Sequence, residues 1–521
     1  MEKEEYTRKA DTSIVVALTG ASGSMGREAL KQLLECDFIS KIKLLLLNNA
    51  KEKATFRRWK LRYGKRVEAI FGDIATYSDC QELVENADYL INMAAVIPPK
   101  SDHNHYAAYN ANILGPKNLV DVLEKSSNPP KFIHISSVAV YGNRDYKHPW
   151  GRVGDPLIPS VFDVYAQQKM TAELFVTESS LDKWCILRQT AMLHNKMLSN
   201  NMKDGLMFHT ALNSPLEWVT AKDSGLLIKN IIIKDYNNQA NMLWKNIYNI
   251  GGLSKNRCTG YETFDDGFKI IGGSAEAFLS PEWHITRNFH GMWFSDSEIL
   301  NDQFDFVKQT KEEYWQEILK NHWYYIIAKI LPKRFIGYVG IKRLLKDENS
   351  PTHWINASDY SRVYACFGDG DKPTKNWSDF KLFCKNQIAN IDYQTSKNTP
   401  TTLSHGYDET KPDNELGIND YRQAAKFRGG ELLSAENDSG DLFTKATWKC
   451  SEGHTFNMTP FAVLKGGHWC KECNKLNQWN YDKLAKTNKF LAEVWYDTHS
   501  TNENMYYYFE DEIARSKKIA E

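Results

Sequence analysis

The chain has 521 residues, of which 42% are hydrophobic and 25% are charged, and its 65 basic side chains balance its 65 acidic ones. This composition is ordinary for a globular protein, and zero net charge gives no global attraction to nucleic acid or anionic lipid. The length exceeds what one hydrophobic core usually holds, so two or three domains are expected.

Residues 1–13 are charged and lack the apolar core of a signal peptide, and no apolar run reaches the length of a membrane span. We therefore expect a cytoplasmic protein without a membrane partner. Of the nine cysteines, six are scattered singly and three gather at Cys450, Cys470 and Cys473. This usage indicates a reducing compartment and a metal site, not a disulfide framework.

A short apolar run at residues 14–18 predicts a buried strand, and an amphipathic pattern at residues 27–34 predicts a helix. Gly20, Gly23 and Gly26 lie between them. At such a junction the glycines permit a tight turn, the approach of a diphosphate and close packing of helix on strand. No Gly-Lys-Ser/Thr follows, which argues against a nucleoside-triphosphate loop, so the expected ligand is a dinucleotide. Three glycines in a turn are a weak signal when they stand alone.

The next expected strand, residues 42–47, ends at Asn48 and Asn49. Sites that prefer NAD usually have an acidic residue near this strand end, whereas basic residues accommodate the 2′-phosphate of NADP. The acid is absent here, and the four basic residues that follow favour NADP: Lys51, Lys53, Arg57 and Arg58. The alternative is that these charges form a solvated helix face.

Further strands are expected at residues 67–71, 89–93 and 132–135, with a helix at residues 112–123. Asp73 follows the first of these strands and is placed to meet the adenine edge. Ala94 and Ala95 follow the second and are small enough to let a cofactor lie close. Strands that alternate with helices predict an α/β fold, a Rossmann-type doubly wound parallel sheet that binds its ligand at the carboxyl ends of the strands.

The strand at residues 132–135 runs into Ser137, and Tyr165 and Lys169 follow on a predicted helix. A spacing of four places Tyr165 and Lys169 on one helix face. A neighbouring ammonium stabilises a phenolate, so this pair suits proton transfer near neutral pH, and a serine hydroxyl can bind the same substrate oxygen. Tyrosine and lysine also occur four apart by chance in many helices.

Taken in order, these motifs resemble the extended short-chain dehydrogenase/reductase family, the group of NAD-dependent nucleotide-sugar epimerases and dehydratases. The resemblance covers residues 14–252. It implies an NAD(P)-dependent enzyme that moves hydride between the nicotinamide and a carbinol or carbonyl of a nucleotide-sugar-like or other small substrate. Tyr165 would be the acid/base, Lys169 would lower its pKa, and Ser137 would polarise the substrate oxygen. The implied cofactor-binding residues are Thr19, Gly20, Ser22, Gly23, Met25, Gly26, Asn48, Asp73, Ile74, Ala94, Ala95, Asn112, Tyr165, Lys169 and Arg188.

The chain departs from the family pattern at several positions. Gln189 replaces the proline that usually follows Arg188, and His194 and Asn195 occupy a turn that is usually Tyr-Gly-Pro. Residues 137–139 lack the Thr-Asp-Glu triplet of sugar 4,6-dehydratases, which argues against that chemistry. The alternative function is a catalytically silent dinucleotide sensor or assembly protein that acts through its C-terminal part.

The rest of the chain divides by composition. The resemblance implies that residues 1–255 form an NAD(P)-binding domain with part of the substrate-binding region, and that residues 256–389, which are mostly helical and aromatic-rich in pattern, form a substrate cap. Residues 390–416 are polar and are expected to be a linker. Residues 417–521 form a small zinc-binding module.

Four side chains in this last part offer the nitrogen and sulfur donors that tetrahedral zinc prefers: Cys450, His454, Cys470 and Cys473. His468 is an alternative fourth ligand, but its position two residues from Cys470 makes His454 the better choice. A Cys-x-x-Cys pair can also be redox-active, although no thioredoxin-like pattern surrounds this one. A small module with little core gains folding energy from such a metal.

This segment also resembles the zinc-ribbon-like repeats of bacterial and phage proteins, over residues 419–495. Between residues 416 and 480 there are eight basic and seven acidic side chains, so no electrostatic footprint for nucleic acid is present. We expect a structural zinc that mediates protein contacts or assembly, for which a homodimer is one form.

Overall fold

The computed structural model describes residues 13–197, 203–325, 329, 332–333, 337–369, 375–381, 396–434 and 441–509. A seven-stranded parallel sheet lies at its centre, in the order β10-β7-β5-β4-β1-β2-β3. The strand order runs outward from β1 in both directions, which is the doubly wound arrangement of Rossmann-type folds. The strands are β1 (Ile14–Thr19), β2 (Ile39–Leu46), β3 (Val67–Phe71), β4 (Tyr89–Asn92), β5 (Lys131–Ser137), β7 (Trp184–Gln189) and β10 (Asn246–Ile250).

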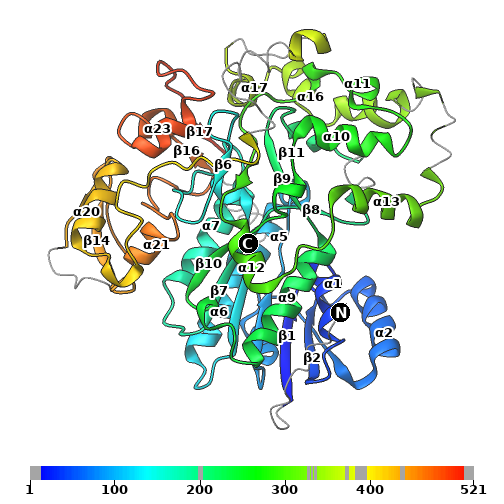
Figure 1. Ribbon diagram of the computed structural model, residues 1–521, viewed down its shortest axis with the longest axis vertical. Coiled ribbons are helices and arrows are strands. Elements are labelled where there is room, and N and C mark those ends of the chain that lie inside the picture. The colour runs from blue at the N-terminus through cyan, green and yellow to red at the C-terminus, as the bar shows by residue number, and fades with distance from the viewer. Residues whose placement is uncertain are drawn as a thin grey trace, which may run out of the picture.

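Helices cover both faces of this sheet (Figure 1). One face packs on α1 (Ser24–Leu33) and α9 (Ala221–Tyr236), with the aromatic side of α2 (Ala50–Tyr63) at its margin. The other face packs on α3 (Tyr77–Val84), α6 (Gly115–Lys125) and α7 (Val164–Thr177). Double coverage explains why β4 and β7 are buried at every position. The predicted fold class is therefore confirmed.

The predicted strands are all present, with ends that shift by a few residues. β2 begins at Ile39, three residues earlier than its apolar run, because Ile39 is itself buried in the core. The expected helix at residues 112–123 begins as α6 at Gly115, after a π-helical turn at Asn110–Leu114. Two short helices precede that turn, α4 (Lys100–His103) and α5 (His105–Tyr109). Within the described ranges, no helix has both the length and the apolar character needed to cross a bilayer.

Above the carboxyl end of the sheet lies a mixed cap (Figure 1). It contains a three-stranded sheet in the order β11-β9-β8 and a pairing of β12 with β6. These strands are β6 (Trp150–Gly151), β8 (Ala191–Leu193), β9 (Pro215–Thr220), β11 (Arg257–Thr259) and β12 (Trp293–Phe294). The helices are α10 (Gly260–Lys269), α11 (Ala275–Phe278), α12 (Ser297–Phe304), α13 (Lys311–Asn321), α16 (Pro351–Asn356) and α17 (Tyr360–Phe367).

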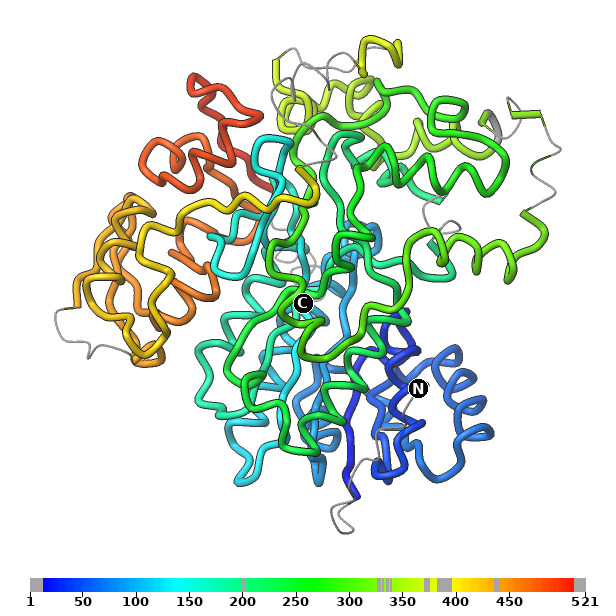
Figure 2. The backbone as a smooth tube through the Cα atoms, viewed as in Figure 1, coloured from blue at the N-terminus to red at the C-terminus, as the bar shows by residue number. Residues whose placement is uncertain are grey.

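The C-terminal module, orange to red in Figure 2, consists of short elements on one side of the sheet domain. A three-stranded antiparallel sheet, β13-β14-β15, follows its first helix. The elements are α20 (Ile418–Phe427), β13 (Glu431–Leu432), β14 (Ala446–Lys449), β15 (Thr455–Met458), α21 (Pro460–Leu464), β16 (Gln478–Trp479), α22 (Tyr481–Leu484), α23 (Lys489–Trp495) and β17 (Tyr507–Tyr508).

The module shares a hydrophobic core with the sheet domain. The ring of Phe461 on α21 packs edge-on against Trp184 of β7, with centroids 5.6 Å apart. Apolar residues of α3, α6 and α7 belong to the same buried cluster as those of α20 and α21. Because both sets of residues are buried in one cluster, the module packs onto the sheet domain and is not a separately packed unit.

The described part of the predicted linker, residues 396–416, also packs against the body. His405 is fully buried, and its Nε2 lies 2.8 Å from Asp155 Oδ1. Glu409 accepts hydrogen bonds from the Arg152 guanidinium. Residues 390–395 of this segment lie outside the described residues. The segment is thus held by buried charges that its polar composition did not reveal, and the division of the chain into domains stays a prediction.

Candidate active site and metal centre

The glycine turn between β1 and α1 has two glycines that packing requires and one that lies open. Gly20 has a φ of +68°, and a Cβ added there would lie 2.5 Å from the carbonyl carbon of Met93. A Cβ on Gly26 would lie 2.2 Å from the Gly20 oxygen. Gly23 is exposed, and the nearest atom to a Cβ there lies 3.1 Å away. The backbone at Gly23 is therefore exposed and less crowded than at Gly20 or Gly26.

Helix α1 begins at this opening without a side-chain cap, since its N-cap residue is Gly23. The N–H groups of its first turn are suited to an anion such as a diphosphate. Asn48 and Ala95, which follow β2 and β4, are exposed at the same edge of the sheet, and Ser22 is half-buried. The residues at this edge thus fit a dinucleotide.

Other predicted cofactor residues bond to the protein itself. The Thr19 hydroxyl donates to Asn92 Oδ1 over 2.6 Å. The Asn112 amide bonds to both the N–H and the carbonyl of Val96, at 2.9 and 2.8 Å, and so holds the chain after β4. The remaining residues line the edge with partial or full burial: Met25, Asp73, Ile74 and Ala94. Their contacts shape the edge, and direct cofactor binding by them stays a prediction.

Ser137, Tyr165 and Lys169 meet at the carboxyl end of β5. Ser137 ends that strand, and Tyr165 and Lys169 lie one turn apart on α7. The Ser137 hydroxyl lies near enough to the Tyr165 phenol to favour its ionised form, and it accepts from Ala139 N over 3.2 Å. Lys169 Nζ donates to the Ile135 carbonyl over 2.9 Å, two residues before Ser137. The three predicted catalytic residues thus lie near the carboxyl end of β5, and their catalytic role stays a prediction.

Burial sets the protonation of this group. Burial raises the pKa of Tyr165 to about 12, although the nearby Ser137 hydroxyl opposes the rise. Burial lowers the pKa of Lys169 to about 8, against the attraction of Glu173 one turn further along α7. At neutral pH the phenol is therefore a proton donor and the lysine is mainly cationic.

Two residues that the sequence analysis did not single out position α7. Asp163 is its N-cap, and its Oδ1 accepts from Ala166 N over 2.9 Å. Asp163 Oδ2 lies 2.8 Å from His290 Nδ1 in the cap. Gln168 accepts from Asn112 over 2.8 Å. An aspartate just before a helical pattern is a recognisable cap signal, whereas nothing in the sequence indicates the pairing of Gln168.

The guanidinium group of Arg188, on β7, forms hydrogen bonds with several neighbouring protein groups. Its Nε and Nη2 donate to the two carboxylate oxygens of Glu173, at 3.0 and 2.6 Å, and its Nη1 donates to the Tyr141 hydroxyl over 2.8 Å. Nη2 also donates to the Gly466 carbonyl over 2.7 Å. Each guanidinium nitrogen has a protein acceptor, so Arg188 links α7, Tyr141 and the C-terminal module in the protein interior. Its contact with a cofactor stays a prediction.

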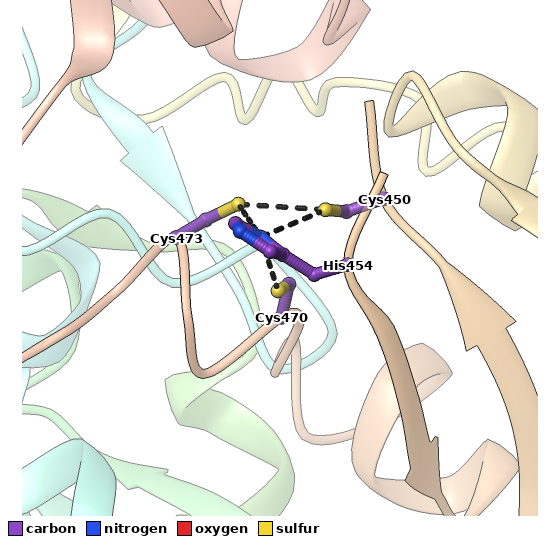
Figure 3. Close-up of side chains that lie close together, drawn as sticks. All are labelled: Cys450, His454, Cys470 and Cys473. Atoms are coloured by element: carbon purple, nitrogen blue, oxygen red, sulfur yellow. Dashed lines mark hydrogen bonds between the residues drawn. The ribbon is translucent and has the colours of Figure 1, made fainter. Parts of the chain in front are cut away.

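Cys450, His454, Cys470 and Cys473 gather in the C-terminal module (Figure 3). Cys450 follows β14 and His454 precedes β15, while both other cysteines lie on the turn after α21. Their four ligand atoms all lie within 4.8 Å of one another. His468 is not in this group, because its Nε2 lies 3.2 Å from Glu173 Oε2.

The spacing of these atoms fits a tetrahedral metal. Zinc–sulfur bonds of about 2.3 Å place two tetrahedral sulfurs about 3.8 Å apart. Cys473 Sγ lies 3.6 Å from Cys450 Sγ and 3.5 Å from His454 Nδ1. The donor set of three sulfurs and one imidazole nitrogen is one that structural zinc sites use.

Comparisons with known proteins agree with the sheet domain. Residues 16–192 match the model of the NAD dependent epimerase/dehydratase family. The chain is 26% identical over 125 residues to a UDP-glucose 4-epimerase of Rickettsia canadensis, a match that covers 24% of this chain and 37% of that protein. It is 23% identical over 170 residues to a D-erythronate dehydrogenase of Haemophilus influenzae, a match that covers 32% of this chain and 50% of that protein.

The chain thus spans half or less of the length of these curated relatives. Among solved structures, it is similar to a dTDP-glucose 4,6-dehydratase from Bacillus anthracis in complex with NAD. That similarity has a TM-score of 0.47 and 17% sequence identity, over 61% of this chain and 98% of the other.

Proposed function

We propose that this protein is an NAD(P)-dependent oxidoreductase or epimerase, since residues 16–192 match the model of the NAD dependent epimerase/dehydratase family. Its substrate is a carbinol or carbonyl compound, of the nucleotide-sugar type or another small molecule. The observation that carries the proposal is the meeting of Ser137, Tyr165 and Lys169 at the end of β5. A bound nicotinamide would supply the hydride exchange, and these side chains supply the proton transfer.

Each side chain has a separate task. The Tyr165 phenol gives a proton to the substrate oxygen or takes one from it, and the Ser137 hydroxyl hydrogen-bonds the same oxygen. The Lys169 ammonium stabilises the phenolate form of Tyr165 when the tyrosine acts as base. Val138 and Ala139 bear no acid or base, so we expect proton and hydride exchange without elimination of water.

Residues at the carboxyl edge of the sheet would hold the cofactor, and the exposed backbone at Gly23 and the first turn of α1 would receive its diphosphate. Asn48 stands where NAD-preferring sites place a carboxylate, and it is exposed. Lys51, Lys53, Arg57 and Arg58 follow, and all four are exposed on α2. This setting supports NADP over NAD.

The cluster of Cys450, His454, Cys470 and Cys473 holds a structural zinc ion. Its support is the tetrahedral spacing of the four donors and the small size of the elements around them. A metal adds folding energy to a module of such short elements.

Two measurements test this function. Mass spectrometry of ligand released from the purified protein should find a dinucleotide and identify its phosphate count. Incubation with NAD or NADP and a panel of nucleotide sugars and simple 2-hydroxy or keto compounds should either change the absorbance of the nicotinamide, for a net oxidation or reduction, or convert a nucleotide sugar into its epimer with no net change in absorbance. A protein that binds a dinucleotide and shows neither a redox change nor an epimerised product with any member of the panel would support the silent sensor instead.

A further inference from the structure

The loop that carries Cys470 and Cys473, residues 465–477, and the start of β16 form hydrogen bonds with α7, the helix that carries Tyr165 and Lys169. We call residues 465–477 the metal-bearing loop. Gln167 lies between these two residues on α7 and is 3% exposed. Its Nε2 donates to the carbonyls of Lys475 and Gln478, each over 3.0 Å, and its Oε1 accepts from Asn477 N over 2.8 Å. One side chain thus makes three hydrogen bonds to the backbone that directly follows Cys473.

A second set of contacts between the loop and α7 lies about two turns further along the helix. Glu173 is fully buried, and residues on the other side of the cysteine pair contact it and its partner Arg188. His468 Nε2 lies 3.2 Å from its Oε2, and Gly466 accepts from Arg188, the ion-pair partner of Glu173. Residues 466–468 precede Cys470 as residues 475–478 follow Cys473.

The end of the helix is held as well. Glu178, just beyond α7, accepts hydrogen bonds from the backbone and the hydroxyl of Thr459, at 3.0 and 2.8 Å. Thr459 is the N-cap of α21, the helix that leads into the metal-bearing loop. Contacts from the module therefore lie along the whole length of α7.

The loop between these contacts has little regular structure to hold its shape. Between the end of α21 at Leu464 and the start of β16 at Gln478, the described chain contains no helix or strand. Its internal support includes Asn474 N, which donates to Cys470 O over 3.2 Å. Four donors on one metal would join this loop to the β14–β15 hairpin and so fix both segments that hold α7.

We infer that the metal-closed loop is a positioning element for catalysis: metal occupancy, transmitted through Gln167 and Glu173, sets the placement of Tyr165 and Lys169. Gln167 is the main positioning residue, because it makes the direct contacts nearest to both. This inference rests on the proposed function for the roles of Tyr165 and Lys169. In this inference the C-terminal module positions α7 of its own chain and does not need to bind another protein.

The test compares zinc-loaded protein, protein stripped with a chelator, and the zinc-loaded variant Gln167→Met, which keeps the side-chain size and removes all three hydrogen bonds. The matched control is Gln32→Met, since Gln32 on α1 donates one hydrogen bond to the Lys222 carbonyl over 2.8 Å. Hydrogen exchange of the α7 amides reports helix placement, and calorimetry reports dinucleotide affinity.

We expect α7 to exchange faster in the stripped protein and in Gln167→Met, while zinc content and dinucleotide affinity of Gln167→Met stay at the wild-type level. With a turned-over substrate, kcat should fall about tenfold to 100-fold at unchanged KM, since a misplacement of ~1 Å has effects of this size. Gln32→Met should match the wild type in every readout.

Wild-type exchange of α7 in Gln167→Met would overturn the inference, even if the stripped protein unfolds. Failure of the proposed function looks different. In that case no nicotinamide-linked turnover is found, or Tyr165→Phe leaves turnover unchanged, and the exchange response of α7 still decides the coupling.

Discussion

Glu173 Oε2 lies 2.6 Å from Nη2 of Arg188, and both side chains are fully buried. Removal of one partner of such a pair leaves an unpaired buried charge, which costs about 3–5 kcal/mol. We therefore expect Glu173→Gln to lower the free energy of unfolding by about that amount in a urea titration at neutral pH. The exposed pair of Lys117 with Asp121 provides the control, because Lys117→Gln should cost about 0.5 kcal/mol or less. Equal losses in the two variants would show that the buried pair does not stabilise the fold.

The same carboxylate gives a pH signature. Burial opposes the ionisation of Glu173, but Arg188 and His468 outweigh it and hold the pKa of the carboxyl well below its ordinary value of 4.5. A lowered pKa adds stability that is fully present above the pKa of the unfolded state and is lost as the pH falls toward the folded one. The stability difference between wild type and Glu173→Gln should thus be constant from about pH 5 to 7 and shrink below about pH 4. A difference that widens in acid would contradict this assignment.

Alanine substitutions at Gly26 and Gly23 of the turn should have different effects, the first on stability and the second on dinucleotide affinity. Gly26→Ala places a Cβ 2.2 Å from a backbone oxygen, so we expect a loss of about 1–3 kcal/mol in stability, seen as a lower Tm. Gly23→Ala places a Cβ 3.1 Å from the Gly20 oxygen, a contact that a shift of a few tenths of an ångström relieves, so its Tm should fall less than that of Gly26→Ala. Its methyl group blocks the open backbone, so dinucleotide affinity in calorimetry should fall about tenfold or more, equivalent to about 1.4 kcal/mol. Unchanged affinity in Gly23→Ala would place the diphosphate elsewhere.

The metal centre makes a stoichiometric prediction. Elemental analysis of purified protein should find about one zinc per chain, as one four-ligand site requires. Cys473→Ser removes a ligand and should lower the zinc content well below that value. Cys36→Ala, at a buried thiol outside the cluster, should leave it unchanged. Full zinc content in Cys473→Ser would mean that the ligand set is different.

The sequence could predict the sheet domain because its signals are local. Apolar runs, a glycine turn and a Tyr-x-x-x-Lys spacing each describe a few neighbouring residues, and the order of the motifs placed them on one known arrangement. The Cys-x-x-Cys pair and the Cys450–His454 spacing are local in the same sense. The four ligand atoms accordingly lie together in the structure.

The packing of the module on α7 could not be predicted in this way. Gln167 and Asn477 are 310 residues apart along the chain, and the Tyr-x-x-x-Lys motif leaves the residue at position 167 unspecified. His468 stood beside a metal ligand in the sequence and suggested coordination, yet it lies against Glu173, 295 positions earlier. Polar residues such as His405 suggested a linker, and only their buried charge partners show why the segment is packed.

The central claim is that Tyr165 transfers the proton at the reacting oxygen. Its most direct test is the kcat of Tyr165→Phe with a substrate that reduces or oxidises the bound nicotinamide, measured beside the dinucleotide affinity of the same variant. We predict a fall in kcat of about 100-fold or more, as loss of a general acid/base produces, at wild-type affinity for the dinucleotide. Wild-type kcat in Tyr165→Phe would contradict the account.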